Sequence, residues 1–389
     1  MGGAAEWADT AVEVFREVRP IADRLPQDRF EVIADRHERR GDAAQRVLGA
    51  VARETGLRQQ IDVRTAPGQT ATSLGLAVER RIRDLLRSED WAGDAQIAEA
   101  AARARDLAPR PVLVKTRDGL VLQAFTAGER TRPAVVLVPP CGMPVELSHR
   151  WLRALGTDHF VVTWQTRGLF DPGGPAEGMP SGVSDQVDDL LAVLDALDLP
   201  TCHVMGLCGG AVLALAAACR RPERFGSMSL WHGDYDFGAG SIKTDHQRDV
   251  QAMMEMGAES PERAAAYQKL MLRPAALAGL PERAAPLVLY PYATPQLFHH
   301  YCRLNSAIMS FDASGLLGGI TQPTLVVTSR TDTTAHPAGS RRVAASLARA
   351  RLVEEPSGDH LSVFDTSSRL IGLAAGFVAE QHSSAPGCR

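Results

Sequence analysis

The chain has 389 residues, of which 45% are hydrophobic and 23% are charged, and its formal net charge at pH 7 is −4. These shares are those of folded globular proteins and exclude a disordered or fibrous chain, and the length predicts two to three domains. No long run of like charges is present in the sequence, which argues against a nucleic-acid partner. No window approaches 18 uninterrupted apolar residues, so we expect no membrane-spanning segment.

The six cysteines form no Cys-x-x-Cys pair, and six in a chain of this length do not indicate a disulfide framework. The first residues lack the basic start, the apolar stretch and the cleavage site of a secretory signal. Both observations favour a protein of the reducing cytoplasm.

Residues 1–108 are expected to form an N-terminal helical region. Apolar residues recur there at helical spacing, for example at Val12, Phe15 and Val18. The pattern ends at Ala-Pro-Arg-Pro (108–111), where proline breaks it. The apolar faces of these helices must be buried on the rest of the chain or on a second subunit, and we slightly favour a homodimer.

From residue 109 onward, short β-branched runs alternate with helical segments. Continuous apolar runs such as 134–138 are typical of strands that are buried on both faces of a parallel sheet, and 112–115 with 120–124 flank a hairpin turn at Asp118-Gly119. Further strands are predicted at 160–164, 202–205, 227–231, 324–328 and 351–354, and helices at 145–155, 183–197, 209–220, 338–349 and 361–380. The alternation predicts the α/β class, a doubly wound and mostly parallel sheet with its active site at the carboxyl ends of the strands.

The alternation is interrupted once, between Trp231 and Gln322, by a stretch with helical spacing and several prolines but no convincing strand. We interpret 236–319 as a helical cap. It would be inserted between a first part of the core, 109–235, and a second part, 320–389.

The strongest chemical motif is Gly206-Leu207-Cys208-Gly209-Gly210, which lies between a predicted strand and a predicted helix. A tight strand-to-helix turn forces its central residue into a strained backbone conformation and requires small neighbours, which the glycines supply. The start of the following helix also favours a thiolate, because free N–H groups and the helix dipole stabilise negative charge. The sequence therefore predicts Cys208 as a nucleophile. The plainer alternative is a small buried residue in a glycine-rich turn of a protein that has lost catalysis.

Two partners for this thiol follow later in the chain. Asp332 comes directly after the strand 324–328, and His360 lies in a loop 28 residues further on, before an apolar helix. This order of nucleophile, acid and histidine predicts that Asp332 fixes the tautomer of His360, which takes the proton from Cys208 or pairs with it as an imidazolium. Asp359 and Asp234 compete as the acid. A surface histidine and a helix-capping aspartate are the plainer interpretations.

An oxyanion hole is expected from the N–H of Gly209 and one N–H in the loop after residue 138. Pro139 and Pro140 have no N–H, so Cys141 is the candidate and Gly142 the second choice. Cys141 is alternatively a second reactive thiol or a buried structural one. Weaker candidates for substrate contact are Gly142, Met143, His232 and Tyr235.

Three other polar residues have weaker claims. Arg167 is expected to be structural, and the adjacent His299 and His300 are expected under the cap. No His-Glu-x-x-His or Cys-x-x-Cys cluster accompanies them, so we expect neither a metal nor another cofactor.

Residues 112–235 and 322–380 resemble the α/β-hydrolase superfamily in the elbow, acid and histidine motifs. The Gly-Leu-Cys-Gly-Gly elbow is similar to those of dienelactone hydrolases, some thioesterases and polyhydroxyalkanoate synthases, and Ser-Gly-Asp-His-Leu-Ser-Val-Phe (357–364) resembles the histidine loop of those synthases. The N-terminal helical region and the overall character look more like stand-alone enzymes of actinobacterial specialised metabolism. Some of these, associated with spirotetronate pathways, eliminate an acetyl ester.

The resemblance and the residues together support three hypotheses. The first is cleavage or transfer of an acyl group through an acyl-Cys208 intermediate, with a small-molecule ester or thioester, free or linked to coenzyme A or a carrier protein, as substrate. The second is a lyase that eliminates a carboxylic acid such as acetate from an acylated polyketide-type metabolite. The third is a non-catalytic binding module on the same fold.

Overall fold

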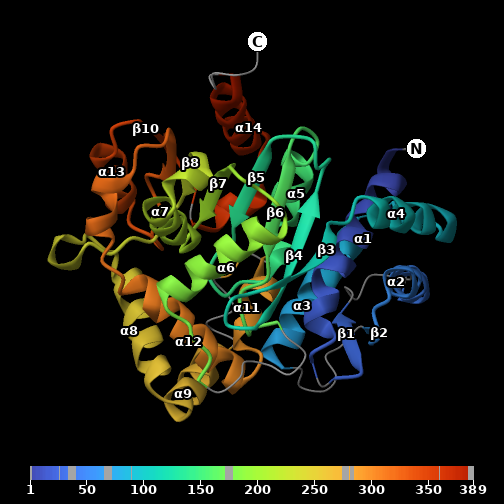
Figure 1. Ribbon diagram of the computed structural model, residues 1–389. Coiled ribbons are helices and arrows are strands. Elements are labelled where there is room, and N and C mark those ends of the chain that lie inside the picture. Colours follow the sequence, from blue (N-terminus) through green and yellow to red (C-terminus); the bar gives the residue numbers. More distant parts are fainter. Residues whose placement is uncertain are drawn as a thin grey trace. The chain divides into compact units, whose positions relative to one another are not determined.

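The computed structural model describes residues 2–25, 27–33, 41–64, 72–88, 90–170, 178–273, 280, 284–358 and 360–383. The chain forms two compact units (Figure 1). The first comprises Met1–Ala108 and Gln268–Ala293, and the second comprises Pro109–Tyr267 and Thr294–Arg389.

The first unit is built around α1 (Gly2–Ala22), which packs against α2 (Gly41–Thr55), α3 (Ser73–Arg83) and α4 (Asp94–Asp106). Its apolar residues Val12 and Phe15 are fully buried, as their helical spacing predicts. Two short strands, β1 (Arg29–Ile33) and β2 (Gln60–Arg64), form a parallel pair that the sequence analysis did not predict. Each strand has five residues and carries charges, so neither shows the apolar run by which the other buried strands were recognised.

The second unit contains an eight-stranded sheet in the order β10-β9-β8-β7-β5-β6-β4-β3 (Figure 1). Its strands are β3 (Arg110–Lys115), β4 (Val121–Ala127), β5 (Ala134–Val138), β6 (Phe160–Trp164), β7 (Cys202–Leu207), β8 (Phe225–Trp231), β9 (Thr324–Ser329) and β10 (Ala350–Glu355). The hairpin β3–β4 is antiparallel and β4 pairs antiparallel with β6, whereas β5 to β10 are parallel. The predicted α/β class with a mostly parallel sheet is confirmed.

The helices of this unit begin and end close to their predicted positions. They are α5 (His149–Leu155), α6 (Val183–Ala196), α7 (Gly210–Arg220), α13 (Pro337–Ser346) and α14 (Ser368–Ser383). The predicted helix at 361–380 divides into a 3-10 turn, His360–Asp365, and α14, while α5 is preceded by a 3-10 turn at Val145–Ser148. Residues of β5, β6, β7 and β9 are buried throughout, so the core lies along the parallel strands.

The segment between β8 and β9 contains α8 (Asp245–Glu259), α9 (Pro261–Met271), α11 (Ala285–Leu289) and α12 (Pro295–Met309), together with short 3-10 turns. In its described residues it forms no strand, only an isolated bridge between Asp236 and Asp312. Helices α8 and α12 pack against each other within the second unit. Across the described part of the chain, no helix is both long and apolar enough to cross a membrane.

Candidate active site

Cys208 occupies a strained turn between β7 and α7. Its φ is +54°, in the left-handed region that non-glycine residues rarely adopt. The turn is held because the Cys208 N–H donates to the Trp231 carbonyl at 2.9 Å and the Cys208 carbonyl accepts from the Ala211 N–H at 3.0 Å. The strain therefore lies at the end of the strand, where it presents the thiol to the site.

Two of the glycines around Cys208, Gly206 and Gly210, are required for steric reasons. A Cβ at Gly206 would lie 2.6 Å from the Ala211 Cα, and one at Gly210 would lie 2.5 Å from the Val138 carbonyl oxygen. A Cβ at Gly209 would make only ordinary contacts with Ile308 and Cys141, at 3.4 and 3.5 Å. The close approach of α7 to the strands therefore depends on Gly206 and Gly210.

The structure brings Cys208, His360 and Asp332 together. His360 is hydrogen-bonded to Cys208, and its Nδ1 lies 3.5 Å from Oδ2 of Asp332. The other carboxylate oxygen of Asp332, Oδ1, accepts the N–H groups of Thr334 and Ala335 at 2.9 and 3.0 Å. Asp332 and His360 are both buried, with 3% and 6% of their surface exposed.

The pKa values of Asp332 and His360 are shifted by their contacts with neighbouring side chains, against the effect of burial. Burial alone would raise the pKa of Asp332, but hydrogen bonds from His232 and His360 hold that pKa well below its usual value. Burial would likewise lower the pKa of His360, but the negative charges of Cys208 and Asp332 and their hydrogen bonds raise it well above the usual value. The site therefore favours the protonated, imidazolium form of His360.

Two alternative acids were considered from the sequence. Asp234 is buried, but its Oδ1 accepts a hydrogen bond from the side-chain amide of Gln247 in α8, and burial raises its pKa. Asp359 lies outside the described residues. Of the described aspartates proposed as the acid, Asp332 is the one in contact with the His360 ring.

The residues expected to supply the oxyanion hole, Gly209 and Cys141, are neighbours in the structure. The loop after β5 places the side chain of Cys141 next to Gly209. The N–H of Gly142 is already used, because it donates to Oγ1 of Thr166 at 3.1 Å. No hydrogen bond joins the N–H of Cys141 or of Gly209 to another described residue. Cys141, and not Gly142, is therefore the loop residue with a free donor.

The thiol of Cys141 has a different environment from that of Cys208. It is buried and donates to Oε1 of Gln186 at 3.2 Å. Burial and the nearby Cys208 raise the pKa of this thiol far above its usual range. The Cys141 side chain therefore stays protonated, as expected of a structural thiol.

Gly142, Met143 and Tyr235 are the next of the weaker candidates for substrate contact. Gly142 has a φ of +74°, and a Cβ there would meet the Tyr301 ring at 2.5 Å, while Met143 is half-buried beside it. Tyr235 is buried; no described residue is a hydrogen-bond partner of its hydroxyl group, and burial and the Cys208 charge raise its pKa.

His232, a weaker candidate for substrate contact, lies against the carboxylate of Asp332. Its Nδ1 is 2.9 Å from Oδ2 of Asp332. No sequence pattern indicates this contact, since it depends on how β8 aligns with β9.

The remaining polar candidates have structural partners. Arg167 is buried and pairs with both carboxylate oxygens of Asp189 at 2.7 and 2.6 Å, as expected of a structural arginine. The rings of His299 and His300 are hydrogen-bonded to the backbone carbonyls of Gly257 and Arg167, respectively.

The side chains of His232, Asp332 and His360 are also close enough to hold a metal ion, since their ligand atoms lie within 4.8 Å of one another. A metal ligand must be a neutral imidazole. The raised pKa of His360 favours the protonated form instead, so the hydrogen-bonded arrangement suits these residues better than a metal site.

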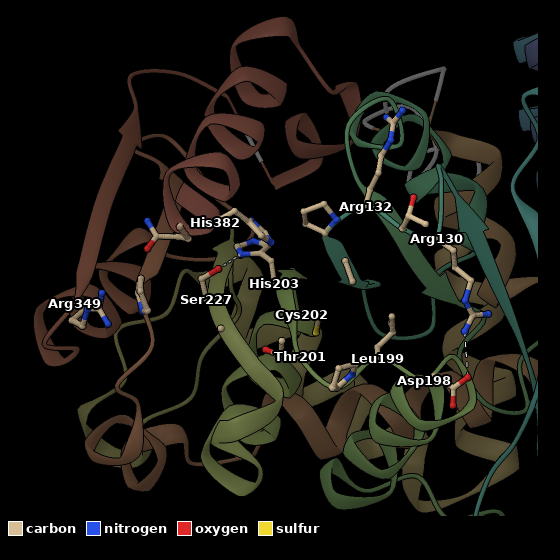
Figure 2. A pocket seen from close by; sticks show the side chains of 17 residues that line it. Arg130, Arg132, Asp198, Leu199, Thr201, Cys202, His203, Ser227, Arg349 and His382 are labelled. Atoms are coloured by element: carbon tan, nitrogen blue, oxygen red, sulfur yellow. Dashed lines mark hydrogen bonds and ion pairs between the residues drawn. The ribbon is translucent and has the colours of Figure 1, made fainter. Parts of the chain in front are cut away.

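A separate cavity of about 670 Å³ lies at the opposite, amino ends of the strands, lined in part by Cys202, His203 and Ser227 (Figure 2). Its arginines do not converge. Arg130 turns to Asp198, and the side chains of Arg132 and Arg349 point in other directions. Because Cys208 follows the carboxyl end of β7, this cavity is not the site of the thiol.

Comparison with known proteins agrees with the fold. Residues 147–367, more than half of the chain, match the family model described as alpha/beta hydrolase fold. RutD of Agrobacterium fabrum, named as a carbamate hydrolase, is 30% identical over 208 residues, which are 52% of this chain and 77% of that protein. The L-allo-isoleucyltransferase of Pseudomonas savastanoi pv. glycinea is 28% identical over 168 residues, 43% of this chain and 58% of that protein.

Among solved structures, the enol-lactonase of Burkholderia xenovorans LB400 superimposes with a TM-score of 0.56 at 21% identity, covering 69% of this chain and all of that one. The fold thus defines an enzyme built on a mostly parallel sheet. The chain belongs to the α/β hydrolase fold family.

Proposed function

We propose that this enzyme cleaves or transfers an acyl group through a thioester formed on Cys208. The observation that carries the proposal is the position of this thiol. It stands at a strained elbow, is hydrogen-bonded to His360 and lies beside the two free N–H groups of Gly209 and Cys141. Nucleophile, proton carrier and oxyanion donors are the three parts that acyl transfer needs.

In the first half-reaction the Cys208 thiolate attacks the acyl carbon of an ester or thioester. The carbonyl oxygen becomes negative as the C–S bond forms, and the N–H groups of Gly209 and Cys141 stabilise it. The tetrahedral intermediate then expels the alcohol or thiol, which takes its proton from the His360 imidazolium. Asp332 balances the charge of that imidazolium while it exists.

In the second half-reaction His360, now neutral, removes a proton from the incoming acceptor. The acceptor attacks the thioester, the C–S bond breaks, and the thiolate of Cys208 is restored beside the imidazolium. Water as acceptor gives hydrolysis, whereas an alcohol, amine or thiol gives transfer. A thioester is reactive towards such acceptors, so transfer competes with hydrolysis.

The similar proteins support both outcomes. RutD is named as a hydrolase and the similar Pseudomonas protein as an isoleucyltransferase, so both reaction types occur under these names in relatives of the chain. We propose a small-molecule ester or thioester of bacterial specialised metabolism as the acyl donor, free or attached to coenzyme A or to a carrier protein.

The test compares turnover of a panel of acyl esters and acyl thioesters by wild type, Cys208→Ala and Cys219→Ala. Cys219 is a matched control because, like Cys208, it is a free and half-buried cysteine. We expect turnover to be lost only in Cys208→Ala, and products made in water enriched in heavy oxygen to show either solvent oxygen in the acid or a new acyl–acceptor bond. An alkene that forms without solvent oxygen would instead establish elimination of a carboxylic acid.

A further inference from the structure

His232 is fixed in place beside the catalytic group. It directly follows β8, its φ is +47°, and its N–H donates to the Val327 carbonyl of β9 at 2.8 Å. Only 1% of its surface is exposed. A buried polar side chain on a constrained backbone indicates a specific role for its ring.

The ring of His232 shares one carboxylate oxygen with His360. Oδ2 of Asp332 is 2.9 Å from Nδ1 of His232 but 3.5 Å from Nδ1 of His360. The two rings are nearly perpendicular, with centroids 6.0 Å apart. By geometry, Oδ2 therefore makes its hydrogen bond with His232, whereas Nδ1 of His360 is at the longer distance of an ion pair and has no hydrogen-bond partner among the described residues.

We propose that His232 is a positioning residue, which donates its Nδ1–H to Asp332 and so limits how strongly Asp332 binds the imidazolium of His360. This role rests on the proposed function, because it presumes that His360 exchanges a proton with Cys208 and the acyl acceptor. A hydrogen bond donated to Oδ2 partly neutralises the negative charge of this oxygen and so weakens its attraction for the His360 imidazolium. His360 then holds its proton less tightly and can release it to the leaving group.

Two further observations agree with this assignment. Of the contacts that lower the pKa of Asp332 against the effect of burial, the hydrogen bond from His232 is the largest. Nε2 of His232 is buried and has no partner among the described residues, so the hydrogen bond of this ring is the one from Nδ1 to Asp332. The titratable groups that face His360 and Cys208 from the packed elements are Asp332, Asp234, Tyr235 and Cys141.

The test measures the alkylation rate of Cys208 by iodoacetamide against pH, with peptide mapping by mass spectrometry. His232→Leu removes the donor and fills its space, so that water cannot replace it. His232→Asn is the matched variant, because its side-chain amide can donate from the position of Nδ1 and asparagine tolerates a positive φ. Since the thiolate and the imidazolium titrate as a pair, the inflection at high pH reports the loss of the shared proton.

We expect this inflection to move up by about one pH unit in His232→Leu, the size of one hydrogen bond to a charged group, and to return to the wild-type position in His232→Asn. An unchanged or lower inflection in His232→Leu would overturn the proposal, as would an equal rise in His232→Asn. If Cys208 of the wild type is alkylated no faster than Cys219, the proposed function fails instead.

A second measurement needs no variant and stands even if His232→Leu does not fold. Nitrogen NMR of the wild-type protein with labelled histidine reads the tautomer of each ring. We expect Nδ1 of His232 to carry a proton. Protonation at Nε2 alone would overturn the proposal, because Nδ1 could not then donate to Asp332.

Discussion

Gly206 offers a direct test of the steric basis of the elbow. In Gly206→Ala the new Cβ would lie 2.6 Å from both the Ala211 Cα and the Gly210 carbonyl oxygen. Both are backbone atoms and cannot rotate away, so α7 must move away from β7. Such overpacking costs about 1–3 kcal/mol, and the rigid neighbours place the expected cost near the upper end, about 3 kcal/mol.

This cost corresponds to a melting temperature that is lower by roughly 6–12 °C, at about 2–4 °C per kcal/mol for a domain of this size. Displacement of the elbow should also slow alkylation of Cys208 by roughly tenfold or more. Differential scanning calorimetry and iodoacetamide labelling measure the two effects. The matched control is Gly315→Ala, because a Cβ at Gly315 meets nothing within 4 Å.

The free energy of unfolding of Gly315→Ala should lie within about 0.5 kcal/mol of the wild-type value. The steric account of the elbow would be refuted if Gly206→Ala had the same melting temperature as Gly315→Ala and its Cys208 were alkylated at the wild-type rate.

Three more predictions follow from the site and its surroundings. Cys141→Ala keeps the backbone N–H and should retain most of the turnover, whereas Cys141→Pro removes that N–H and should lower kcat by about 10²–10³-fold; equal turnover in two folded variants would exclude the oxyanion role. Because folding lowers the pKa of Asp332 below the ordinary 3.8, its contribution to stability is present above that value and is lost as the pH falls through the lowered pKa. The melting temperature of Asp332→Asn should therefore lie furthest below that of the wild type at neutral pH and approach it below about pH 4, and a gap that stays constant with pH would contradict the assignment. Asp189→Ala leaves the buried guanidinium of Arg167 with the half-exposed Asp118 as its remaining carboxylate partner among the described residues and should destabilise the fold by about 3–5 kcal/mol in denaturant titrations; a loss below about 1 kcal/mol would show that the remaining partners suffice.

The fold was largely predictable because most strands of its large sheet are short apolar runs that can be recognised in the sequence. A strand that is buried on both faces of a parallel sheet is rich in apolar residues, as 134–138 are throughout and 324–328 are at their three central positions. The strands β1 and β2 were missed because each has five residues and carries charges, so composition does not separate them from a loop or a helix end.

The elbow and its histidine were predictable for a different reason, since glycine spacing and chain order are properties of the sequence itself. The partner of His360 was not settled in this way, because Asp234 and Asp332 both follow a buried strand. The structure separates them because the side-chain amide of Gln247 donates a hydrogen bond to Asp234. Gln247 lies on a helix whose position sequence spacing cannot predict.

The same limit applies to the oxyanion donors and to His232. Cys141 and Gly142 are neighbours with equivalent N–H groups until Thr166, from the end of another strand, takes one of them. The contact between His232 and Asp332 arises because Trp231 of β8 stands opposite Val327 of β9, and this register is set by packing of the whole sheet.

The measurement that tests the central claim most directly is the mass of the protein after acid quench during turnover of an acyl thioester, followed by peptide mapping of the adduct. We predict one acyl group per chain, on the peptide that contains Cys208, in the wild type and in Cys219→Ala but not in Cys208→Ala. An acyl group on another residue, or full turnover by Cys208→Ala without any adduct, would contradict the account.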